Sequence, residues 1–146
     1  MRKMMLIALA LVLALSVAGC GGVNKSNPGS GSGGITYNKI PFEKVEPGQE
    51  PPEVARELGQ MREKAATKTV VKDGFTYAIV TAGEKSSGGW DVTVGAVGDI
   101  GGQIEVIYRT IAPKPGSVNT AAITYPSVVV KFENAGNLPV VFREEK

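Results

Sequence analysis

The sequence contains no histidine and only one cysteine among its 146 residues. Without histidine, the chain has no imidazole that could serve as a general base, a pH switch or a metal ligand. A single cysteine excludes an internal disulfide framework and a cysteine-rich zinc site. We therefore expect a protein that is not an enzyme and that needs no metal or organic cofactor.

The first 20 residues have the three-part layout of a secretory signal peptide. Arg2 and Lys3 form a positive start, an unbroken apolar run covers residues 4–15, and small residues lead to Cys20. The run is shorter than the roughly 20 apolar residues that a membrane-spanning helix needs. We expect a signal peptide over residues 1–19.

The end of this segment, Val17-Ala18-Gly19-Cys20, resembles the bacterial lipobox. The resemblance implies that the Cys20 thiol carries acyl chains such as palmitate, and that cleavage makes Cys20 the N-terminus. The protein would then be held at the extracytoplasmic face of the cell membrane. Because Gly21 stands where an inner-membrane retention signal has Asp, outer-membrane delivery is allowed if a second membrane exists. The alternative is an ordinary cleaved signal with an incidental cysteine.

The formal charge of +2 belongs to the signal peptide. Removing Arg2 and Lys3 lowers the Lys+Arg count from 16 to 14, which equals the 14 acidic residues, all of them downstream of Cys20. The remaining chain is neutral and has no basic patch for nucleic acid. Nucleic acid is therefore excluded as a partner.

A tether separates Cys20 from the folded part. Residues 21–34 are almost entirely Gly, Ser and Asn, a composition that cannot bury enough apolar surface to fold. Residues 35–50 are either an arm that packs on the domain or more linker. We therefore place the lipidated cysteine and tether at residues 20–50 and the domain at residues 51–146.

The domain begins with a pattern that is typical of an amphipathic helix. Apolar residues recur at i, i+4, i+7 and i+11 within residues 51–66, and Pro52 suits the first helical turn. These apolar positions are Val54, Leu58, Met61 and Ala65.

After this helix the apolar period changes to that of strands. Asp73-Gly74 lies between two β-rich runs and predicts a two-residue hairpin turn. Further alternating or β-rich runs cover residues 90–96, 104–108, 121–125, 128–132 and 138–142. The order predicts an α+β fold, with one N-terminal amphipathic helix packed on a mostly antiparallel sheet of about six short strands.

The stretch from Glu53 to Phe142 resembles the PrcB C-terminal domain family. The resemblance rests on the helix and hairpin, on residues 83–90 (GEKSSGGW), on the loop 113–116 (PKPG) and on residues 123–130 (ITYPSVVV). It implies a subunit of a bacterial cell-surface protease complex, one that assists or stabilises the protease and has no assigned catalytic residues.

No constellation of catalytic residues stands out in this sequence. Lys85 could pair with Ser86 or Ser87, but neighbours on a strand point to opposite faces, so the pairing is poor. Acidic side chains such as Asp91 and Glu105 occupy alternating positions that fit solvated strand faces.

Two loops are candidates for partner binding. In the first, Ser86-Ser87-Gly88-Gly89-Trp90, the only tryptophan either anchors an interface or starts a strand with its ring in the core, and we favour the core. The second covers residues 112–120, where Pro113, Pro115 and Gly116 pre-set an extended chain suited to docking. The commoner alternative for this loop is a plain surface connection.

Together these features predict a membrane-anchored, non-enzymatic binding or accessory module that assists a surface or secreted protease. The alternative is an inhibitor that presents the Ser86–Trp90 loop to a peptidase. Over those few residues the chain is similar to chagasin-type inhibitors of cysteine peptidases. Small-molecule or glycan binding has no supporting motif.

Overall fold

A computed structural model describes residues 36–146 of the chain. The expected signal peptide, the lipidated Cys20 and the Gly/Ser tether fall on residues 1–35 and lie outside the described residues.

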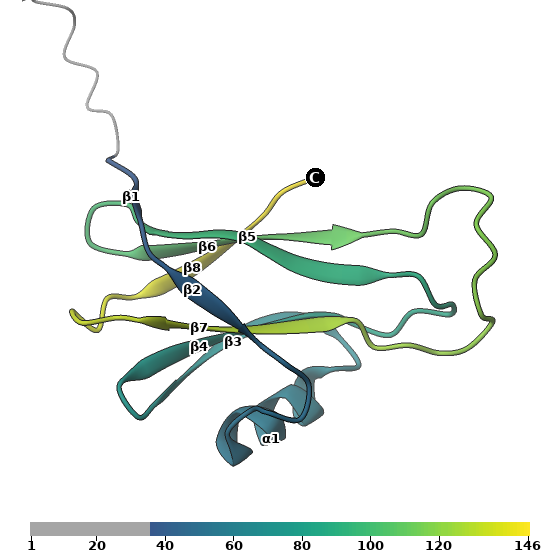
Figure 1. Cartoon of the computed structure of the whole chain (residues 1–146), viewed down its shortest axis with the longest axis horizontal. Coiled ribbons are helices and arrows are strands. Elements are labelled where there is room, and N and C mark those ends of the chain that lie inside the picture. Colours follow the sequence, from purple (N-terminus) through teal and green to yellow (C-terminus); the bar gives the residue numbers. More distant parts are fainter. Residues whose placement is uncertain (1–35) are drawn as a thin grey trace, which may run out of the picture. The chain divides into compact units, whose positions relative to one another are not determined.

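Two four-stranded β-sheets face each other, and one helix covers the outer side of the second sheet (Figure 1). The first sheet has the order β1 (Asn38–Lys39), β5 (Asp91–Asp99), β6 (Ile104–Ile111), β8 (Val140–Glu144). The second sheet has the order β2 (Phe42–Val45), β7 (Ser127–Glu133), β4 (Phe75–Ala82), β3 (Ala65–Lys72). The helix is α1 (Pro52–Met61). All strand pairs are antiparallel except β6–β8.

The prediction of one sheet with about six strands was wrong, because the strands divide between two sheets. In a single sheet with a helix on one side, the other face of β4 would be exposed to solvent. In the structure, seven of the eight residues of β4 are buried. The helix is not the first element of the domain either, since β1 and β2 precede it. Strand β1 belongs to the first sheet and β2 to the second. It also ends at Met61 rather than at residue 66, because Ala65 already pairs with Ala82 in the sheet.

The hairpin at Asp73-Gly74 was predicted correctly. Strands β3 and β4 pair without interruption from Ala65↔Ala82 to Lys72↔Phe75. Asp73 and Gly74 have φ angles of 51° and 81°, the left-handed conformation that a two-residue hairpin turn requires at both positions.

Hydrophobic side chains form one core on each face of β4. Between the sheets, its Ala78, Val80 and Ala82 pack with side chains from β5, β6 and β7. On the opposite face, Tyr77 and Ile79 pack against α1. The domain therefore has three layers, and β4 is in the middle layer.

The end of α1 is held by a hydroxyl group of β4. Thr81 is 3% exposed, and its Oγ1 donates to the carbonyl oxygen of Lys64 at 2.7 Å, just beyond the helix. On the helix itself Val54 is fully buried against this face of the second sheet.

The chain passes between the two sheets twice at the same end of the domain. Residues 83–90 connect β4 to β5, and residues 112–126 connect β6 to β7; we call these segments the first and the second crossover (Figure 1). The predicted strand over residues 121–125 was wrong. Only Thr124 forms a β-bridge there, because this part of the chain leaves one sheet for the other.

The helix layer can be tested at Val54. Val54→Ala removes two fully buried methyl groups and should lower the free energy of unfolding by about 1–3 kcal/mol, measured by urea denaturation. Val71→Ala is the matched control, because Val71 is 66% exposed on β3 and its truncation should cost less than about 0.5 kcal/mol. Equal effects of the two substitutions would contradict the packing described above.

Candidate partner-binding site

The two loops selected from the sequence lie side by side, because they belong to the two crossovers. Lys85 and Thr124 form a β-bridge in which each backbone N–H donates to the other's carbonyl oxygen at 2.9 Å. Further along, the Gly88 N–H donates to the carbonyl oxygen of Thr120 at 2.9 Å. The Thr124 hydroxyl donates to the carbonyl oxygen of Ser87, also at 2.9 Å. The crossovers therefore form one hydrogen-bonded surface.

Two glycines allow the crossovers to pack this closely. A Cβ atom at Gly88 would lie 2.6 Å from Thr120 Oγ1. A Cβ atom at Gly89 would collide with the side-chain amide of Asn119 and lie 3.1 Å from the Cβ of Pro113, and the φ of Gly89 is 82°. Side chains at these positions would push the second crossover away.

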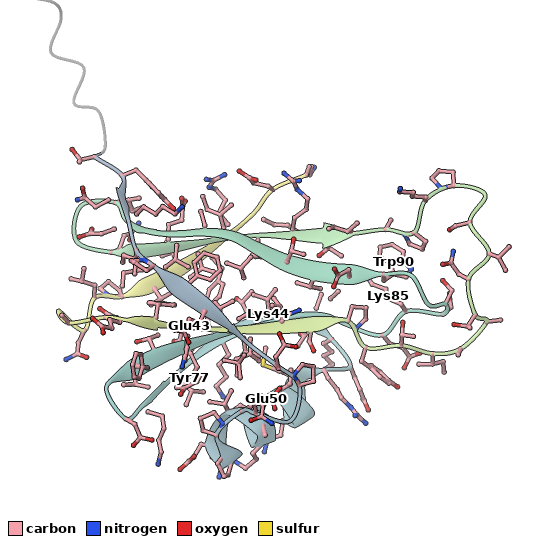
Figure 2. All side chains as sticks on the ribbon, viewed as in Figure 1. Glu43, Lys44, Glu50, Tyr77, Lys85 and Trp90 are labelled. Atoms are coloured by element: carbon pink, nitrogen blue, oxygen red, sulfur yellow. The ribbon has the colours of Figure 1, made fainter. Side chains whose placement is uncertain are left out.

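Trp90 lies at this end of the domain and belongs to neither core. Its ring is half-buried, and the Lys85 ammonium lies 4.7 Å from the ring centroid, within the range of a cation–π contact (Figure 2). The interpretation of Trp90 as a core residue was therefore wrong. A strand begins one residue later, at Asp91, so Trp90 still belongs to the first crossover.

The second crossover also contacts the end of the helix layer. The guanidinium carbon of Arg62 lies 5.0 Å from the centroid of the Tyr125 ring, and the Tyr125 hydroxyl donates to Glu84 Oε2 at 3.2 Å. Partial desolvation raises the pKa of Tyr125 above its ordinary value, and the Glu84 carboxylate adds to this rise. Tyr125 thus stays neutral and joins both crossovers to the residue that follows α1.

The tip of the second crossover is an ordered turn. Pro115 and Gly116 are its central residues, Gly116 has a φ of 79°, and the Ser117 N–H donates to the carbonyl oxygen of Lys114 at 3.0 Å. This is the arrangement of a type II turn, in which Pro pre-sets the first central residue and Gly takes the left-handed second. Asn119 donates to the Ser117 hydroxyl at 2.7 Å and closes the turn further.

The predicted residues differ in exposure. Ser86, Gly89, Pro115 and Gly116 are exposed, whereas Ser87, Gly88, Trp90 and Pro113 are half-buried between the crossovers.

Three apolar side chains that the sequence analysis missed point to solvent around the same site. Val118 is completely exposed, Ile123 is 61% exposed and Ile111, at the end of β6, is 41% exposed. Two of these side chains belong to the second crossover, and Ile111 lies immediately before it. The exposure of Val118 could have been predicted from the sequence. Val118 is an apolar residue between Ser117 and Asn119 and belongs to no helical or strand pattern of apolar residues.

A larger groove, of about 590 Å³, lies at the opposite end of the domain. None of the predicted site residues lines it. Its apolar walls include Ile40, Phe42 and Leu138, which pack against the core between the sheets. We therefore interpret this groove as the edge of the hydrophobic core between the sheets and not as part of the candidate site.

The described residues offer no cluster of three or more acidic, cysteine or histidine side chains that could hold a metal ion. Within residues 36–146, moreover, α1 is too short and too polar to cross a membrane.

Residues 76–133 match the family model described as PrcB C-terminal. Over this segment the chain is similar to the PrcB C-terminal family. The match begins in β4 and ends with β7, so it contains both crossovers and the whole candidate site. Searches of curated proteins and of solved structures found no match.

The packing of the crossovers can be tested with two glycine substitutions. Gly89 and Gly116 have similar positive φ angles, but no atom lies within 4 Å of a Cβ built at Gly116. Gly116→Ala should cost only the left-handed backbone strain, about 1–2 kcal/mol. Gly89→Ala should cost about 1–3 kcal/mol more, because it also overpacks the contact with Pro113.

Urea denaturation followed by the fluorescence of Trp90, the only tryptophan, measures both effects at the site itself. If both alanines cost the same, the close approach of the two crossovers is not as described.

Proposed function

We propose that this protein is a membrane-anchored lipoprotein whose PrcB-like domain is a non-enzymatic accessory module of a surface or secreted protease complex. The family takes its name from PrcB, a subunit of such a complex. The observation that carries the proposal is the apolar surface formed by Ile111, Val118 and Ile123 on an ordered crossover.

This surface suits a protein partner better than a small molecule. The type II turn and the hydrogen bonds between the crossovers fix the backbone before binding, so little further entropy is lost on association. Exposed aliphatic side chains on a rigid support can then enter pockets on a partner and exclude water there. Neither the 590 Å³ groove nor the 380 Å³ cleft beside β3 is lined by these side chains.

The alternative function is a peptidase inhibitor that presents residues 86–90. Against it, Gly88 is hydrogen-bonded to the second crossover, and the Lys85 ammonium lies over the ring of Trp90. The side chains that project furthest belong instead to the second crossover. We therefore prefer the accessory module.

Capture of the full chain from native membranes separates the two functions. An accessory module should bring down a protease that cleaves a casein substrate, whereas an inhibitor should bring down a silent one. Val118→Asp should lower the amount of captured protease at least about tenfold, because it places a charge where an apolar contact is buried. Ala135→Asp is the matched control on an exposed turn at the other end of the domain and should leave capture unchanged.

Equal capture by the two aspartate variants would exclude the crossover surface as the interface. Capture of a silent protease would instead favour the inhibitor.

The membrane anchor is tested separately at Cys20. Two or more acyl chains on one residue hold a protein firmly at a bilayer, whereas a single chain does so only marginally. Cys20→Ser should therefore move the protein from the membrane pellet to the soluble fraction after cell lysis, as seen by immunoblotting. Retention of the serine variant in the pellet would refute the lipid anchor.

A further inference from the structure

Strand β3 is an edge strand whose outer side is open. It pairs with β4 over all eight of its residues and lies last in the second sheet. Among residues 36–146, no strand or helix pairs with its other side. An edge of this length exposes a row of backbone donors and acceptors that another extended chain can match.

The hairpin geometry identifies which backbone groups are free. In a two-residue hairpin, the residues that flank the turn form a hydrogen-bonded pair, here Lys72 and Phe75, and such pairs recur at every second residue. The N–H of Ala82 donates to the carbonyl oxygen of Pro126, just before β7, at 2.9 Å, so this N–H does not donate to its β3 neighbour Ala65. The N–H and C=O groups of alternate residues of β3 therefore point to the open edge: those of Ala65, Thr67, Thr69 and Val71.

The side chains of the same four residues face the first sheet but are only partly covered by it. Their cross-strand partners on β4 point into the core between the sheets, and residues on one face of a sheet share that direction. Ala65 and Thr67 are nevertheless exposed, and Val71 is 66% exposed. All four side chains are uncharged.

Strand β3 lacks the features that usually block an edge. Natural edges are protected by charges, prolines, bulges or short length. The lysines of β3 lie on the other face, where Lys68 Nζ is 2.5 Å from Glu57 Oε2 and Lys72 Nζ is 3.0 Å from Glu53 Oε1 of α1. Each charge is thus paired with the helix.

The other three edge strands of the domain are shorter than β3. Strand β1 has two residues, β2 has four, and β8 has five and carries Arg143 and Glu144. Strand β5 is also unpaired on its β1 side over residues 91–96, but a bulge between Val94 and Ala96 interrupts that edge. Strand β3 is thus the long, regular edge among the described strands.

A cleft runs beside this edge and can receive side chains. It has a volume of about 380 Å³ and lies between Ala65, Ala66 and Thr67 on one side and Tyr108, Thr110 and Glu144 on the other.

We propose that the open edge of β3 binds an extended, uncharged segment of a partner polypeptide by strand addition. The partner's backbone pairs with Ala65, Thr67, Thr69 and Val71, and alternate side chains of the partner enter the cleft toward Tyr108. A second copy of this chain would be limited to antiparallel pairing centred on Thr67 or on Thr69, because centring on Lys68 or on Val70 places lysine opposite lysine. A partner segment without lysine has no such limit. The cleft borders the first crossover, because Lys85 also lines it, but strand addition at β3 requires neither a protease nor a membrane.

The test is residue-resolved amide exchange by NMR on the full chain in detergent micelles. The probe is an acetylated and amidated peptide of eight residues that alternates Thr and Val. It should slow exchange at the amides of Thr67, Thr69 and Val71 by about tenfold or more and leave the β8 amides unchanged. A matched peptide with Pro in place of alternate residues should give no protection, since it lacks the required N–H groups.

A matched pair of variants checks the site. Thr67→Lys places a charge on the inner face of the edge and should weaken peptide binding at least tenfold, with an unchanged far-UV circular dichroism spectrum. Ala135→Lys, on the exposed turn that follows β7 and outside every strand, should bind the peptide like the parent chain.

The proposal is overturned by any of three results. These are no protection at millimolar peptide, protection at β8 instead of β3, or equal peptide affinity of the two lysine variants. A dimer seen by analytical ultracentrifugation that Thr67→Lys dissolves would also overturn it, because the occupant would then be a second copy. The peptide experiment involves no protease, so its failure leaves the proposed accessory function standing.

Discussion

The burial of β4 on both faces is the constraint on which the rest of the domain depends. Its alternate side chains supply the core between the sheets and the core under the helix, so both outer layers are positioned against one strand. Its backbone pairs with β3 on one side and β7 on the other. Thr81, near its end, also hydrogen-bonds to the chain that follows α1. Loss of β4 packing would therefore affect all three layers at once.

The same strand explains why the candidate site exists where it does. Beyond Ala82 the chain must leave the second sheet, and Gly83 turns it with a φ of 75° beside the backbone of Ala65. The return crossover must end where β7 can pair with β4, so the two segments meet at one end. Their contacts need glycine at positions 88 and 89, and Pro115-Gly116 orders the tip. The position of the candidate site thus follows from the topology and a few backbone requirements.

The local features could be predicted from the sequence, whereas the arrangement of layers could not. Asp73-Gly74 identified its hairpin because the turn chemistry is local. Residues 75–82 show no alternation of apolar and polar side chains. This pattern is typical of a strand buried on both faces, and it could have predicted a third layer. Alanines at 65 and 66 fit a helical period equally well, and only pairing with β4 makes them a strand.

The loops at 86–90 and 113–116 could be selected from the sequence as candidate binding loops, but the contact between them depends on tertiary structure. Trp90 lies outside both cores, with the Lys85 ammonium over its ring, and this placement also depends on tertiary structure.

We propose that the crossover end of the domain is the surface that contacts a protease partner. Photo-crosslinking in the native membrane tests it most directly, with a photoreactive side chain placed at Val118 in one variant and at Ala135, at the opposite end, in another. The account predicts a covalent adduct between position 118 and an active protease, and none from position 135. Crosslinking from position 135 alone, or no protease adduct at position 118, would contradict it.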